Sequence, residues 1–124
     1  MANVYQNQKI AVFGASENTA KYGYKIFHTL LAKGFSVYGI NPKGGQADGH
    51  TFYTRLSDVP EAIDVAILVI PPAAAPEAVA QCQAQHVKEI WFQPGAQNPA
   101  AFTAAEQANM HAVNGCFMAE NGLW

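Results

Sequence analysis

Two short groups of residues near the start of the chain have the types and the spacing that could hold a phosphate. The groups are Gly14, Ala15 and Ser16, then Lys21, Tyr22 and Gly23. A glycine turn that leads into a helix presents unpaired backbone N–H groups and the positive end of the helix dipole to an anion. The Ser16 hydroxyl and the Lys21 ammonium can add a donor and a charge. Without the full G-x-G-x-x-G fingerprint, a glycine that simply ends a strand is the alternative.

A second candidate contact lies at Asn41, Pro42 and Lys43, after the next predicted strand. NAD-binding domains place a carboxylate near this position, where it accepts hydrogen bonds from the ribose hydroxyls. An amide and a cation stand here instead, which disfavours NAD and favours a ligand with an additional phosphate nearby. A plain Asn-Pro turn is the structural alternative.

The hydrophobic pattern predicts the elements that position these residues. Buried strands are expected at 10–13, 35–40, 65–70 and 88–92, a short strand at 51–53 and a last strand at 115–118. Helices are expected at 22–33, at 76–85 and from the N-cap Asn98 to about His111, with a turn or short helix at 56–62. This alternation predicts one α/β domain over residues 1–124: a Rossmann-like, three-layer fold with a mostly parallel sheet of five or six strands.

The composition excludes several classes of protein. The chain has 124 residues, 50% hydrophobic and 13% charged, which is typical of one compact domain and not of a disordered chain. The first residues lack the pattern of a signal peptide, and the longest apolar run, 65–70, is too short to span a membrane. Two cysteines make no disulfide framework, so a cytoplasmic location is expected.

The net charge of −2 is unevenly distributed along the chain. Residues 1–47 carry five lysines against Glu17 alone, a net charge of +4, whereas residues 48–124 carry Arg55 and Lys88 against eight acids, a net charge of −6. A local cationic region on an acidic protein suits a small polyanion better than a nucleic acid, which needs a broad basic face. Scattered, solvated lysines are the alternative.

The other reactive side chains form no recognisable catalytic or metal site. The four histidines are His28, His50, His86 and His111, and none has a metal-ligand spacing to another histidine or cysteine. Ser16 has no visible His–Asp partners, and no P-loop motif is present. The cysteines are Cys82 and Cys116. Both are expected to be buried structural thiols, with a mixed disulfide to a thiol ligand as the alternative.

The loops after four predicted strands together resemble one family. These loops contain Gly14–Ser16, Asn41–Lys43, Ile70–Pro72 and Gln93–Ala96, and the chain is similar from about Lys9 to Met118 to the small stand-alone CoA-binding proteins, a Rossmann-like family. The loop from Pro42 to Gly45 also resembles the CoA-binding domain of succinyl-CoA synthetase alpha subunits. The resemblance implies coenzyme A as the ligand. It implies phosphates near Ser16, Lys21 and Lys43, and an adenine near Pro42 and Pro71.

The resemblance thus predicts a non-catalytic module that binds coenzyme A or an acyl-CoA. The synthetase has a further domain with a phosphorylated histidine, and this chain ends at Trp124, so the synthetase reaction is not expected. A small NAD(P)-dependent oxidoreductase, or a CoA transferase-type enzyme, is the alternative. No nucleic acid or membrane partner is expected, and Tyr5 and Trp124 could belong to a contact between subunits. The predicted ligand contacts are Gly14, Ala15, Ser16, Lys21, Tyr22, Gly23, Asn41, Pro42, Lys43, Ile70, Pro71, Pro72, Gln93 and Gly95.

Overall fold

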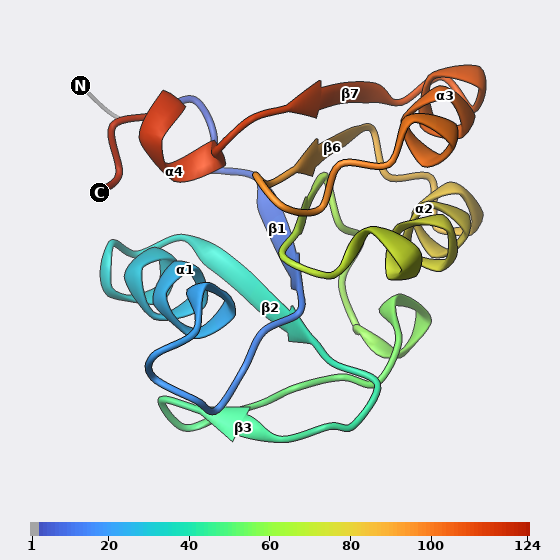
Figure 1. Cartoon of the computed structure of the whole chain (residues 1–124). Helices are drawn as coiled ribbons and strands as arrows, with labels where there is room; N and C mark the ends of the chain where they lie inside the picture. Colours follow the sequence, from blue (N-terminus) through green and yellow to red (C-terminus); the bar gives the residue numbers. More distant parts are fainter. Residues whose placement is uncertain (1–2) are drawn as a thin grey trace.

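The computed structural model describes residues 3–124, so the first two residues of the predicted domain lie outside the described part. Its centre is a five-stranded parallel sheet with the strand order β2-β1-β5-β6-β7 (Figure 1). The strands are β1 (Lys9–Phe13), β2 (Ser36–Ile40), β5 (Val65–Leu68), β6 (Glu89–Phe92) and β7 (His111–Asn114). The predicted α/β class and parallel sheet are therefore confirmed.

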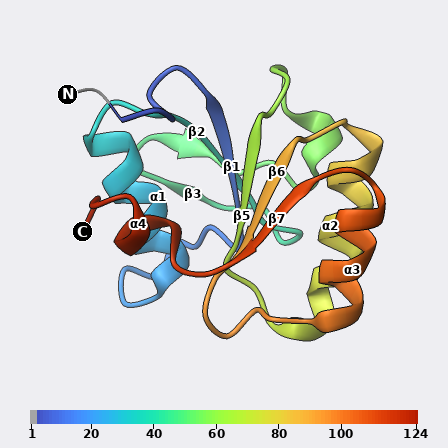
Figure 2. The same ribbon diagram turned by 90° about the horizontal axis from the view of Figure 1, so that it is seen from above.

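Helices cover both faces of this sheet and make the fold three layers thick. The helices are α1 (Tyr22–Ala32), α2 (Ala75–Ala84), α3 (Pro99–Gln107) and α4 (Phe117–Glu120), with 3-10 turns η1 (Leu56–Asp58) and η2 (Pro72–Ala74). Figure 2 shows α1 and α4 on one face and α2 and α3 on the other. The helices that connect parallel strands cover the faces of the sheet, so its central strands are buried on both sides. Such strands are expected to be apolar throughout.

The sheet separates two hydrophobic clusters, one on each of its faces, and β1 contributes side chains to both. Ile10 and Val12 pack in the cluster with Phe27 and Leu30 of α1, whereas Ala11 and Phe13 pack in the cluster that contains α2 and α3. These four residues of β1 are at most 5% exposed, whereas Lys9 at its start is partly exposed. The strand therefore reads as a continuous apolar run rather than an alternating one, which is why its sequence predicts a buried parallel strand.

The segment between β2 and β5 forms a small hairpin instead of the strand predicted at 51–53. Its strands are β3 (Gln46–Ala47) and β4 (His50–Thr51), which pair antiparallel, while Tyr53 makes an isolated bridge with Ile40. Asp48 lies in its turn at a φ of +51°, and its carboxylate contacts His28 Nδ1 of α1 at 2.6 Å. The hairpin is thus attached to α1.

Two sequence predictions for the C-terminal quarter are wrong. The helix expected to reach His111 ends at Gln107, because Asn109 adopts a left-handed φ of +64° and the Met110 N–H donates to the Ala105 carbonyl. His111 therefore begins β7 rather than ending a helix. The strand expected at 115–118 is the start of α4, with Cys116 as its N-cap. Among residues 3–124, no helix is long and apolar enough to cross a membrane.

Candidate functional site

The strand order places one topological switch point between β1 and β5. The chain leaves β1 through α1 to reach β2 on one side, and later returns to β5 on the other side of β1. The loops that follow β1 and β5 therefore diverge over opposite faces of the sheet. In open α/β sheets, ligands bind in the crevice that this divergence opens at the carboxyl ends of the strands.

A groove of about 570 Å³ lies at this switch point. We call it the switch-point groove, and its lining residues are Gly14, Ser16, Ala20, Lys21, Tyr22, Gly23, Asn41, Pro42, Val69, Ile70, Pro71 and Ala74. Most of the residues singled out in the sequence are thus brought to one surface. Sequence reasoning missed Ala20, Val69 and Ala74, which are small or apolar residues with no chemical signature of their own.

The start of α1 contributes hydrogen-bond donors and a lysine to the groove. Lys21 is the N-cap of this eleven-residue helix, it makes no side-chain capping bond, and the first turn contains no acidic residue. The first N–H groups of a helix have no acceptor within it, so those of Tyr22 and Gly23 are available to a ligand. Ser16 Oγ accepts a hydrogen bond of 3.0 Å from the Asn18 N–H, which leaves the hydroxyl hydrogen to donate. A phosphate fits this arrangement.

Gly14 and Gly23 allow the backbone at the switch point to approach closely. A Cβ on Gly23 would overlap the Gly14 carbonyl oxygen, and a Cβ on Gly14 would overlap the Val69 carbonyl oxygen. Gly14 also has a φ of +91°. Both glycines are therefore needed to pack the ends of β1 and β5 and the start of α1 together. The separate expectation that Gly14 lets the backbone approach a ligand stays a prediction.

Asn41 holds two of the predicted loops together. Its Nδ2 group donates to the carbonyl of the buried Ala15 at 2.9 Å, and its Oδ1 accepts from the Lys43 N–H at 2.9 Å. A second hydrogen bond connects the same two segments, since Glu17 Oε1 accepts from the Gln46 N–H at 2.8 Å. The Asn41 side chain thus positions the loops after β1 and β2, in addition to lining the groove.

Ala15 is buried and Gln93 lines a smaller cavity, so with Lys43, Pro72 and Gly95 a total of five predicted contact residues lie outside the groove. Lys43 is exposed beside it, in the same loop as Pro42. Pro72 is also exposed, and its carbonyl accepts from Asn98 Nδ2 at 2.9 Å. Gly95 is exposed in the loop after β6, where its N–H donates to Gln97 Oε1 at 2.7 Å. Of these, Lys43 has a charged side chain, and its contact with a ligand stays a prediction.

A smaller cavity of about 250 Å³ adjoins the groove. We call it the β5–β6 cavity, and it is lined by Tyr22, Val69, Gln93, Pro94, Cys116 and Trp124. Tyr22 and Val69 also line the switch-point groove, so the two hollows share a wall. The rings of Tyr22 and Trp124 lie with centroids 6.5 Å apart. The sequence predicts Gln93 as a ligand contact and includes Pro94 in the loop that resembles the family, but it does not predict that Trp124 lines a cavity with them.

Gln93 and Cys116 form the polar part of this cavity. Gln93 is only 6% exposed; its Oε1 accepts from the Phe117 N–H at 2.7 Å, and its Nε2 donates to Cys116 Sγ at 3.4 Å. Burial raises the pKa of the Cys116 thiol, but hydrogen bonds from the Gln93 side chain, the Ala119 and Met118 backbone and the Trp124 side chain outweigh it. On balance, the pKa of the Cys116 thiol lies below the usual value for cysteine. Cys116 is half-buried rather than fully buried, which departs from the expected structural thiol.

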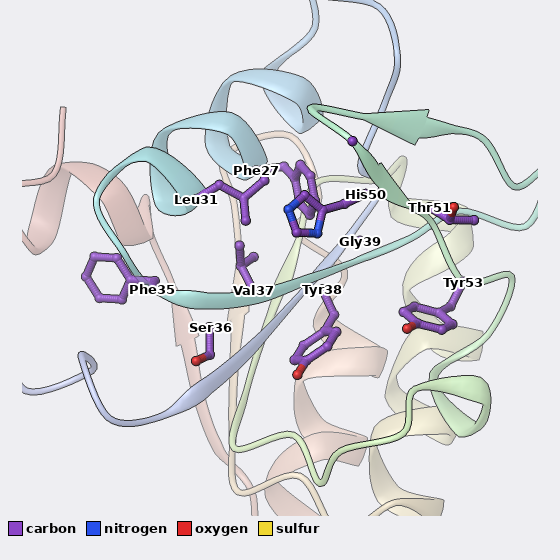
Figure 3. A pocket seen from close by; sticks show the side chains of 11 residues that line it. Phe27, Leu31, Phe35, Ser36, Val37, Tyr38, Gly39, His50, Thr51 and Tyr53 are labelled. Carbon is purple, nitrogen blue, oxygen red and sulfur yellow. The ribbon is translucent and has the colours of Figure 1, made fainter.

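A third hollow, of about 470 Å³, lies along the free edge of β2 (Figure 3). Its walls come from the end of α1, from β2 and from the β3–β4 hairpin, and His50 stands opposite Phe27 with ring centroids 6.2 Å apart. None of the predicted contact residues lines it. Within residues 3–124, no group of three histidine, cysteine, aspartate or glutamate side chains could hold a metal ion.

Solved structures share this fold at nearly full length. A hypothetical protein from Pyrococcus horikoshii OT3 superposes with a TM-score of 0.88 at 32% identity, covering 93% of this chain and 82% of that chain. A conserved hypothetical protein from Pyrococcus furiosus superposes with a TM-score of 0.84 at 36% identity, covering 91% and 98%. The dinucleotide-forming acetyl-coenzyme A synthetase 1 of Ca. Korarchaeum cryptofilum superposes with a TM-score of 0.76 at 29% identity, over 87% of this chain and 25% of that chain.

Sequence relatives of known activity match over a part of their length. The alpha subunit of the ADP-forming acetate–CoA ligase I of Pyrococcus furiosus is 30% identical over 93 residues, which are 70% of this chain and 20% of that protein. An ADP-forming acetate–CoA ligase of Methanocaldococcus jannaschii is 33% identical over 81 residues, 65% of this chain and 12% of that protein. The chain thus spans about a fifth or less of these relatives. The sequence model of the CoA binding domain matches residues 8–122, and the chain therefore belongs to the CoA binding domain family.

Proposed function

We propose that this chain binds coenzyme A or an acyl-CoA and does so as a binding module rather than as an enzyme. The observation that carries the proposal is the switch-point groove, in which an uncapped helix start, Lys21 and the Ser16 hydroxyl meet in a member of the CoA binding domain family. The names of the curated relatives point to the same ligand, because these proteins are ligases that act on CoA.

The groove suggests how the ligand is oriented. The diphosphate lies against the start of α1, where the helix dipole and the Lys21 ammonium favour negative charge. The adenine lies between the rings of Pro42 and Pro71, which are both exposed on the groove wall. The 3′-phosphate of the ribose is then within reach of Lys43. The pantetheine arm runs past Tyr22 and Val69 toward the β5–β6 cavity.

The same geometry argues against NAD as the ligand. No carboxylate stands at the end of β2, and Asn41 already uses both ends of its amide on Ala15 and Lys43. The ribose hydroxyls of NAD would find at most the second lone pair of Asn41 Oδ1 as an acceptor. In coenzyme A the 3′-oxygen of the adenosine ribose carries a phosphate, which needs hydrogen-bond donors or a cation rather than a carboxylate, and this extra phosphate suits the cationic first part of the chain.

The first prediction concerns ligand preference. Coenzyme A at millimolar concentration is expected to raise the melting temperature by several degrees, because a ligand that binds the folded state stabilises it by mass action. NAD at the same concentration is expected to give little change. Thermal unfolding followed by tryptophan fluorescence or calorimetry checks this. NADP is the stricter control, since its additional phosphate can also meet Lys43. A shift by NAD equal to that by coenzyme A would return the chain to the dehydrogenase-like class.

The second prediction concerns the lysines beside the groove. Lys21→Ala and Lys43→Ala are each expected to weaken the binding of coenzyme A by about 5- to 30-fold, the effect of removing one charge-assisted bond. Lys33→Ala is the matched control, because Lys33 caps the opposite end of α1. Calorimetric titration at low and high salt measures the change, and the loss is expected to shrink as salt increases. If Lys33→Ala lowers the affinity for coenzyme A as much as Lys21→Ala does, the overall charge of the protein and not the position of Lys21 sets the affinity.

A further inference from the structure

We infer that the β5–β6 cavity receives the sulfur end of a CoA disulfide and that Cys116 exchanges with it to form a mixed disulfide. The inference rests on the proposed function, since the groove must hold the nucleotide part of the ligand. It adds a covalent modification site and a ligand class, the low-molecular-weight disulfides that carry the nucleotide of coenzyme A.

The position and the walls of the cavity support this assignment. It shares Tyr22 and Val69 with the switch-point groove, so a ligand arm that leaves the groove along the strand ends enters it directly. Within residues 3–124, the large exposed hydrophobic side chains are Val4, Tyr22 and Trp124, and the latter two line this cavity. Exposed aromatic walls around a small hollow are typical of a site that an apolar ligand segment covers.

The buried amide of Gln93 points to the same occupant. Its Nε2 group carries two hydrogens, and among the described residues Cys116 Sγ is the acceptor found for it. The Oε1 end is fixed by the Phe117 N–H, so the amide cannot turn away from the sulfur. The second hydrogen is left for an acceptor of the ligand, such as a pantetheine amide carbonyl.

The surroundings of Cys116 favour the reactive form of its thiol. Gln93 Nε2 and the Ala119 N–H both donate to Sγ at 3.4 Å, and donors of this kind stabilise a thiolate. Cys82 provides the contrast within the same chain. It is fully buried, and burial raises the pKa of its thiol to about 12. A buried thiol of that kind is inert, so exchange is expected at Cys116 alone.

The reaction balances without another oxidant. The Cys116 thiolate attacks one sulfur of the CoA disulfide, and a new bond forms between Cys116 Sγ and that sulfur. The original S–S bond breaks, and the second coenzyme A leaves as a thiolate that takes a proton from water. The Cys116 sulfur is oxidised and the leaving sulfur is reduced, so the ligand disulfide itself is the oxidant.

The experiment uses the full chain, reduced and freed of reductant. It is incubated with CoA disulfide or with oxidised glutathione, and intact-mass spectrometry follows the adduct with time. The adduct with one coenzyme A is expected to form at least about tenfold faster than the glutathione adduct, because the groove holds CoA disulfide near the thiol. Peptide mapping of the wild-type protein is expected to place the adduct on Cys116, and dithiothreitol is expected to remove it.

Three variants separate this inference from its alternatives. Cys116→Ser is expected to take no adduct, whereas Cys82→Ala is expected to react as the wild type does. Lys21→Ala is expected to slow labelling by CoA disulfide and not by oxidised glutathione. Equal rates for the two disulfides, or an adduct on Cys82, would overturn the inference. If coenzyme A still raises the melting temperature in that case, the proposed function stands; if it does not, both fail.

Discussion

Replacing Gly14 by alanine is expected to lower the free energy of unfolding by about 3 kcal/mol or more, the sum of backbone strain and overpacking. The strain arises because Gly14 has a φ of +91°, where an L side chain is disfavoured. The overpacking arises because the new Cβ would overlap the Val69 carbonyl oxygen, which belongs to backbone and cannot rotate away. Denaturant unfolding followed by circular dichroism measures the loss.

Substitutions at two other glycines measure the backbone strain and the overpacking separately. Gly95 has a φ of +98° but open space around it, so Gly95→Ala is expected to show the strain alone. Gly23 lies in the first turn of α1, where alanine is a better helix former, but its Cβ would overlap the Gly14 carbonyl oxygen. The loss of stability in Gly23→Ala is therefore expected to come from the overlap alone. If Gly14→Ala destabilises the protein no more than Gly95→Ala does, the close approach of β1 and β5 is not what requires glycine.

The sequence predicted the parts of the fold in which local pattern and tertiary packing agree. The apolar runs of β1 and β5 are buried on both faces, so an unbroken hydrophobic stretch is the form that such strands take. The turn from Gly14 to Gly23 combines glycine with the start of an amphipathic helix, and the structure places it at the switch point. A strand end, a glycine turn and a helix start are all local features, so one sequence is enough to indicate them.

The C-terminal quarter could not be predicted because its local pattern is ambiguous. The alanine-rich run of α3 continues past Gln107 without glycine or proline, and the helix ends where Asn109 adopts a left-handed conformation. β7 is half-exposed at the sheet edge and has a weak apolar pattern. The β5–β6 cavity depends on this misread segment, since Cys116 and Trp124 approach Tyr22 only after β7 and α4 are placed.

The role of Asn41 shows a similar limit within the site. Its position at the end of β2 is visible in the sequence, and so is the lack of a carboxylate there. Its bonds to the Ala15 carbonyl and the Lys43 N–H are tertiary, and no spacing rule indicates them. A residue proposed to face the ligand thus also fixes the loops that hold the ligand.

Replacing Gln93 by leucine is expected to cost about 1–3 kcal/mol of stability, the penalty for leaving a buried donor unsatisfied. Leucine has a similar size, but it cannot accept from the N–H of Phe117, a residue that is 0% exposed. Unfolding in urea measures the loss. Gln97→Leu is the matched control, because Gln97 Oε1 also accepts a backbone hydrogen bond, from the Gly95 N–H, at an exposed position where water can replace it.

The same variant is expected to change the reactivity of Cys116. Its hydrogen bond from Gln93 lowers the pKa of the thiol, so removing that bond raises the pKa and reduces the thiolate fraction at neutral pH. The rate of reaction with an aromatic disulfide reagent is therefore expected to fall at pH 7, with the midpoint of its pH profile moved to higher pH. Gln97→Leu is expected to leave both unchanged. A Gln93→Leu protein that is less stable but keeps the wild-type pH profile would show that Gln93 supports the backbone of α4 without tuning the sulfur.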